Sequence, residues 1–142
     1  DTIMPKCIMK AEKIVCIGTP FYNYYQRRGS ISNSNFSTKN FDLVNANQLR
    51  LEFYKHNCKN LVASARAAYI DSMLSVFPGA YKANLTDRLT ELQQKIVEEL
   101  SLCKMRDIYP YKIKLKIILY KLSPAFFSFV VMLMRSSMMC KG

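Results

Sequence analysis

The sequence predicts a mainly α-helical protein with a short β segment near its N-terminus, and two observations carry this prediction. Between Phe41 and Leu102, apolar residues recur at the three- and four-residue spacing of amphipathic helices. Near the start, the β-branched run KIVCI at 13–17 is ended by Gly18 and Pro20, which is typical of a strand. The chain has 142 residues, of which 50% are hydrophobic, so it is long and apolar enough to fold around a core.

The N-terminal part is expected to contain a helix, two short strands and a loop. Apolar spacing in residues 3–11 predicts a short helix, which the strand at 13–17 follows. The aromatic segment 20–25 predicts a second extended stretch, and the polar residues 26–40 predict a long loop. We therefore expect residues 1–40 to form one part of the chain, distinct from the helical region that follows.

The remainder, residues 41–142, is expected to be a helical region. Its first helix is expected to be capped by Asp42 and to continue to about His56. A second helix is expected over residues 59–76, where a proline and a glycine at 78–79 stop it. The pattern indicates helices joined by short connections.

A third helix with one apolar face is expected after Asn84 or Thr86, either of which is a suitable capping residue. Glutamate and lysine side chains on its other face indicate an ordinary amphipathic helix of the core. Residues at helical spacing in the three helices are expected to form the core: Leu49, Phe53, Leu61, Ile70, Leu74, Leu89, Leu92 and Ile96.

The last third mixes lysines with large apolar residues. Pro124 separates the segment 111–122 from an apolar run at 125–134, which is too short for a spanning helix of roughly 20 residues. The run is consistent with a buried final helix, and equally with a helix that binds an anionic membrane surface. The side chains expected at such a surface are Lys112, Lys114, Lys116, Lys121, Phe126, Phe127 and Phe129.

The cysteines indicate neither a disulfide framework nor a zinc site. They number five, none forms a Cys-x-x-Cys pair, and none has metal-ligand spacing to His56. Free thiols in a reducing cytoplasm are expected, and the chain begins without a basic or apolar leader. The cysteines are Cys7, Cys16, Cys58, Cys103 and Cys140.

The net charge of +11 indicates an anionic partner. Nucleic acid, the phosphates of a nucleotide sugar and an acidic membrane surface all meet this description. The lysines are spread over many segments and no recognised nucleic-acid motif is present, so nucleic acid is not expected. A non-catalytic basic helical module that binds a membrane surface or nucleic acid remains the alternative function.

The stretch KIVCIGTPFYNYYQRRGSIS at 13–32 resembles the segment that follows the catalytic Glu-Asp pair in bacterial family-two inverting glycosyltransferases of the GT-A fold. Those enzymes typically read Pro-Leu-Tyr-Tyr-Tyr-Arg-Gln-Arg-x-Gly-Ser-Ile-Ser, and Tyr25 stands here in place of an arginine. Asp1 and Thr2 stand where the Asp-Thr of that pattern would stand. The matching residues are Pro20, Tyr22, Tyr24, Gln26, Arg27, Gly29, Ser30, Ile31 and Ser32.

The resemblance implies that residues 1–40 are the end of a GT-A catalytic domain and that residues 41–142 are its helical, membrane-associated C-terminal region. It implies transfer of a sugar from a nucleoside-diphosphate donor to a glycan or lipid-linked acceptor, with inversion, in cell-surface polysaccharide synthesis. The expected location is cytoplasmic, peripheral on the inner face of the membrane.

The resemblance also assigns site residues. Asp1 is the candidate catalytic base, and Arg27, Arg28, Gly29 and Ser30 are the candidate loop for the donor diphosphate or the acceptor. A solvated terminal carboxylate and a solvated basic loop are the simpler interpretations of the same residues. The enzymes use Mg²⁺ or Mn²⁺ held by an Asp-x-Asp pair, and this sequence contains no such pair. We therefore expect the metal and nucleotide sites upstream of Asp1, and no activity from this chain alone.

Overall fold

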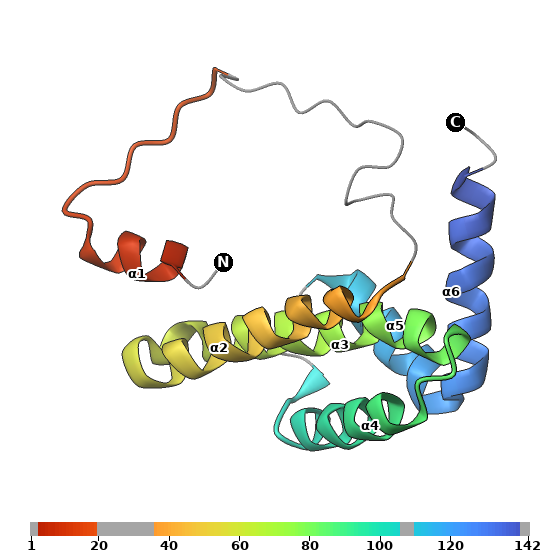
Figure 1. Cartoon of the computed structure of the whole chain (residues 1–142). Helices are drawn as coiled ribbons and strands as arrows, with labels where there is room; N and C mark the ends of the chain where they lie inside the picture. The colour runs from red at the N-terminus through yellow and green to blue at the C-terminus, as the bar shows by residue number, and fades with distance from the viewer. Residues whose placement is uncertain (1–2, 20–35, 106–109, 140–142) are drawn as a thin grey trace.

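The computed structural model describes residues 3–19, 36–105 and 110–139 (Figure 1). These parts of the chain are mainly helical, as predicted, and they contain no strand. The helices are α1 (Ile3–Lys10), η2 (Thr38–Asn40), α2 (Phe41–Asn57), η3 (Lys59–Leu61), α3 (Val62–Lys82), α4 (Thr86–Ser101), α5 (Tyr111–Leu122) and α6 (Pro124–Met139), where η denotes a short 3₁₀ helix.

Helix α3 is the centre of the fold. It packs against α2 and α4, its neighbours along the chain, and against α5 and α6 from the C-terminal part. Ile70, Met73 and Leu74 are completely buried, and the buried residues of α3 cover most of its circumference, except for a polar strip around Asp71 and Ser75. A helix with so wide a buried apolar surface is stable only when other elements cover it. The outer helices supply that cover, and Figure 1 shows α2 running beside α3.

The outer helices each contribute one narrow stripe to the core. Leu92 and Ile96 of α4 are buried one turn apart, while Ile113, Ile117 and Tyr120 of α5 are buried at helical spacing. Phe77, Tyr120 and Phe127 form a chain of edge-to-face aromatic contacts, with centroid distances of 5.2 and 5.9 Å. These rings join α3, α5 and α6.

Half of the expected core residues are buried as predicted, namely Ile70, Leu74, Leu92 and Ile96. Phe53 and Leu89 are half-buried. Leu49 and Leu61 are exposed, so their prediction was wrong. Helix α2 is apolar on several faces, and it faces the core through Val44 and Leu51, whose seven-residue spacing places Leu49 on the other side.

The residues expected to cap and stop helices act differently. Asp42 lies inside the first turn of α2 and does not cap it. The expected stop at 78–79 does not end α3, which continues to Lys82 with Pro78 inside it. Proline removes one backbone hydrogen bond and costs about 3 kcal/mol in a helix interior. Burial of the adjacent Phe77 and Ala80 offsets that cost.

Asn84 ends α3 instead of starting α4. Its φ of 53° is left-handed, a conformation that asparagine tolerates better than most residues. The N–H of Leu85 donates to the carbonyl of Ala80, at 3.2 Å, and the N–H of Asn84 donates to the carbonyl of Tyr81, also at 3.2 Å. This pair of bonds is the Schellman motif. Helix α4 then begins at Thr86 without a side-chain cap.

The predicted strand at 13–17 is absent. The segment leads away from α1 as an exposed trace (Figure 1), and the side chains of Ile14, Val15 and Ile17 are exposed. A strand forms only when its backbone pairs with a neighbour, and no other described segment is extended to pair with it. The β-branched residues therefore lack the partner that their pattern requires. The second predicted strand, at 20–25, lies outside the described residues.

A largely buried ion pair holds α4 to α3. Arg66 Nε lies 2.9 Å from Glu99 Oε2, and Arg66 Nη1 donates to the carbonyl of Leu102, at 3.0 Å. Burial, followed by the negative charge of Glu99, raises the pKa of the nearby Tyr69 to about 12. The hydroxyl of Tyr69 is therefore protonated throughout the physiological range and adds no negative charge beside Glu99.

Candidate functional site

The five residues assigned by the resemblance lie outside the described part of the chain. They are Asp1, Arg27, Arg28, Gly29 and Ser30. The structure does describe the end of the predicted loop, where Phe36 and η2 join the helical region. The geometry of that junction is the first candidate site.

The junction is built on a glycine of α3. Gly79 has no Cβ, and an added Cβ would lie 2.7 Å from both Cγ and Cε2 of Phe36, which is closer than real Cβ contacts. The Phe36 ring therefore occupies the space that a side chain at position 79 would need. Phe36 also meets Phe41 edge to face, with centroids 6.1 Å apart. The Ser37 N–H donates to Asn40 Oδ1, at 2.8 Å, which fixes the turn into α2.

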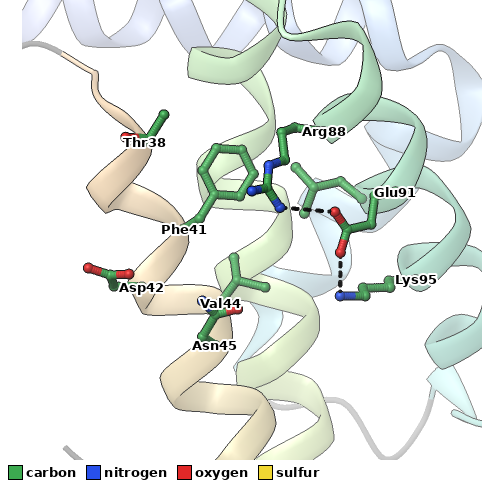
Figure 2. A pocket seen from close by; sticks show the side chains of 9 residues that line it. Thr38, Phe41, Asp42, Val44, Asn45, Arg88, Glu91 and Lys95 are labelled. Atoms are coloured by element: carbon green, nitrogen blue, oxygen red, sulfur yellow. Dashed lines mark hydrogen bonds and ion pairs between the residues drawn. The ribbon is translucent and has the colours of Figure 1, made fainter.

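A small cleft between α2 and α4 adjoins this junction, and its volume is about 150 Å³ (Figure 2). The guanidinium of Arg88 lies over the Phe41 ring, 5.7 Å from its centroid. Glu91 accepts from Lys95 at 2.8 Å and from Arg88 at 3.2 Å. The hydrogen bond from Lys95 is the main reason that the pKa of Glu91 is lowered. Figure 2 shows Asp42 pointing away from these groups.

The chemistry of the cleft indicates a structural role. Arg88 and Lys95 are both paired with Glu91, so the cleft offers an incoming phosphate only one uncompensated positive charge. The contact of Arg88 with Phe41 instead joins α4 to the start of α2, beside the junction at Phe36. We interpret the cleft as part of the anchor that holds the end of the predicted loop.

A larger groove lies between α2, α3 and α5, with a volume of about 450 Å³, and polar side chains interrupt its mainly apolar lining. Lys116 Nζ of α5 lies 2.6 Å from Asp71 Oδ1 of α3 and donates to Ser75 Oγ at 3.3 Å. Asn47 and Lys112 lie on its other sides. A carboxylate, an amide, a hydroxyl and ammonium groups line the groove, and these are groups that bind the hydroxyls of a glycan.

Sequence reasoning missed this groove. Asp71 stands inside the apolar stretch of α3, and Lys116 stands among the lysines of the last third, 45 positions away. A single acidic residue within a buried apolar helix was the only available signal that a partner would be needed. Within the described ranges, no group of histidine, cysteine, aspartate and glutamate residues is arranged to hold a metal ion.

A glycine substitution tests the junction. Gly79→Ala is expected to lower the free energy of unfolding by about 1 kcal/mol, because the cost of displacing the Phe36 ring exceeds the gain in helix propensity. Once Phe36 is removed, the sign should reverse, and Phe36→Ala with Gly79→Ala should be more stable than Phe36→Ala alone. Urea unfolding of the four proteins measures both differences. The same destabilisation in both backgrounds would show that Phe36 does not occupy this space.

Comparison of the chain with protein-family models, with curated proteins and with solved structures finds no match. Its function must therefore be argued from its own residues. Among the described helices, none combines the length and apolar character needed to cross a membrane.

Proposed function

We propose that this chain is the C-terminal part of a bacterial inverting glycosyltransferase of family two. The enzyme transfers a sugar from a nucleoside-diphosphate donor to a glycan or lipid-linked acceptor in cell-surface polysaccharide synthesis. One observation carries the proposal: the ordered match of residues 20–32 to the family's Pro-Tyr-Tyr-Gln-Arg-Gly-Ser-Ile-Ser pattern, with Asp1 at the position of the catalytic carboxylate.

The reaction requires three chemical functions. A carboxylate takes the proton of the acceptor hydroxyl as that oxygen attacks the anomeric carbon, and Asp1 has this role in the proposal. Mg²⁺ or Mn²⁺, with ligands upstream of Asp1, neutralises the leaving diphosphate. Arg27 and Arg28 supply guanidinium groups, and the loop at Gly29 and Ser30 supplies backbone amides, for the same charge.

Two features of the fold support the proposal. Ile14, Val15 and Ile17 are exposed β-branched residues, as expected for a strand whose partner strands belong to the rest of a GT-A domain. The Phe36 ring, seated against Gly79, gives the predicted loop a fixed end on the helical region. Apart from these two features, the groove at Asp71 and Lys116 is the candidate contact for the acceptor glycan.

A transfer assay with two proteins tests the proposal. One is the 142-residue chain, and the other is the same chain preceded by its upstream coding sequence. With a panel of nucleotide sugars and Mg²⁺ or Mn²⁺, only the longer protein is expected to release nucleoside diphosphate and extend an acceptor. Turnover by the chain alone would contradict the placement of the metal and donor sites. The proposal would be overturned if the longer protein is inactive and binds none of the nucleotide sugars in the panel.

A further inference from the structure

Helix α5 has a second apolar stripe that faces away from the core. Its members are exposed to 71% at Tyr111, 44% at Leu115, 49% at Ile118 and 74% at Leu122. They follow one another at intervals of four, three and four residues, so they share one face of the helix. The buried stripe, which includes Ile117, lies on the opposite face. An ordinary surface helix would carry polar residues where this stripe lies.

Three lysines flank this outward stripe. At 3.6 residues per turn, Lys112 lies on one side of it, and Lys114 and Lys121 lie on the other. Lys116 is different, because it faces inward and is paired with Asp71. Neither α5 nor α6 contains an acidic residue, so no carboxylate of these helices neutralises the three flanking lysines.

The structure leaves fewer side chains available for a membrane surface than the sequence suggested. Phe127 is completely buried and Lys116 is paired, so neither is available to an external partner. Phe126 and Phe129 of α6 remain exposed. The outward stripe of α5 was not expected, because its residues alternate with lysines in the sequence and show their common face only on a helix.

We propose that the outward face of α5 docks on an anionic lipid bilayer. Charge complementarity selects this partner: the apolar stripe enters the boundary between headgroups and acyl chains, and the flanking lysines meet the lipid phosphates. Nucleic acid would satisfy the lysines but would leave Leu115 and Ile118 exposed to water. A helix of 12 residues is about 18 Å long and lies in the plane of the surface. The inference stands on α5 alone and does not depend on the proposed function.

Cosedimentation with vesicles tests the charged part of this face. The full chain is expected to bind vesicles in which about a quarter of the lipid is phosphatidylglycerol, and to bind pure phosphatidylcholine vesicles more weakly. Lys112→Gln, Lys114→Gln and Lys121→Gln together should weaken binding to the anionic vesicles roughly 100-fold. The matched control replaces Lys10, Lys59 and Lys82 by Gln, which lowers the net charge equally but on helices other than α5.

A second pair of variants tests the apolar part. Leu115→Ser with Ile118→Ser should weaken binding by at least about tenfold, while Leu49→Ser with Leu61→Ser, also exposed, should leave it within about twofold. Circular dichroism confirms that each variant keeps its helices. The chain contains no tryptophan, so Ile118→Trp gives a single fluorescence reporter. Its emission should shift to shorter wavelength on anionic vesicles, whereas that of Leu49→Trp should not.

Several results would overturn the proposal. One is equal binding to both vesicle types, and another is binding to neither. A third is an equal loss in the control lysine variant. Binding to single-stranded DNA is measured in parallel. If the triple lysine variant loses binding to the DNA but still binds vesicles as the unaltered chain does, the partner of the lysines is nucleic acid. If Leu115→Ser with Ile118→Ser instead converts a dimer into a monomer, and the chain does not bind vesicles, the face joins two copies.

Discussion

Asp1→Asn, made in the chain preceded by its upstream coding sequence, is expected from the proposed function to lower kcat roughly 100- to 10,000-fold. Asparagine has nearly the shape of aspartate but cannot accept the proton of the acceptor hydroxyl. Donor binding should remain nearly unchanged, because the proposal assigns the diphosphate to the metal and to Arg27 and Arg28. Initial rates at saturating donor and acceptor give kcat, and calorimetric titration gives the donor Kd.

Asp42→Asn is the matched control for this substitution. Asp42 is an exposed carboxylate in the first turn of α2, and the proposal gives it no chemical role. It should retain the kcat of the unaltered protein. Equal rates for Asp1→Asn and Asp42→Asn would remove Asp1 from the role of base. A loss of donor affinity in Asp1→Asn, with kcat retained, would instead move Asp1 to the donor site.

Phe77→Ala is expected to lower the free energy of unfolding by about 3–5 kcal/mol, more than the other stability substitutions proposed here. Phe77 is 1% exposed, and its ring meets Tyr120 of α5 edge to face. Removing the ring leaves a cavity and also breaks the aromatic chain that continues from Tyr120 to Phe127. Urea unfolding monitored by circular dichroism measures the change.

Phe129→Ala is the control, since it deletes the same ring from an exposed position on α6. Its expected change is within about 0.5 kcal/mol. Equal losses for Phe77→Ala and Phe129→Ala would mean that the aromatic chain does not hold α5 and α6 to α3. A selective loss at Phe77 would confirm that the C-terminal helices belong to the same core as α3.

Helices and their order could be predicted because apolar periodicity is a local property of the chain. Helix α4 shows this best, since its polar face left Leu89, Leu92 and Ile96 as the residues to be buried, and Leu92 and Ile96 are buried while Leu89 is half-buried. The prediction that Leu49 is buried was wrong because α2 has apolar residues on several faces, and only the packing with α3 decides which of them is buried. The prediction that α3 ends before Pro78 was wrong because tertiary packing offsets the local cost of a proline in a helix, and this packing cannot be read from the local sequence.

The candidate sites also differ in whether local sequence could reveal them. The resemblance at 13–32 rests on a local motif, so it could be found from sequence, but the structure describes only residues 13–19 of it. The pair of Asp71 and Lys116 could not be found, since 45 positions separate the residues and only the packing of α5 on α3 joins them. The strand at 13–17 failed for a related reason, because strand pairing depends on residues far along the chain.

The covered position of α3 determines where the sequence of this protein can vary. A helix that packs against four others concentrates packing constraint in its buried residues, where most changes of side-chain volume create a cavity or a clash. The outward faces of α4 and α5 carry no such constraint. Selection can exchange charges and apolar groups on those faces, and so alter the choice of surface or partner, while the interior stays the same.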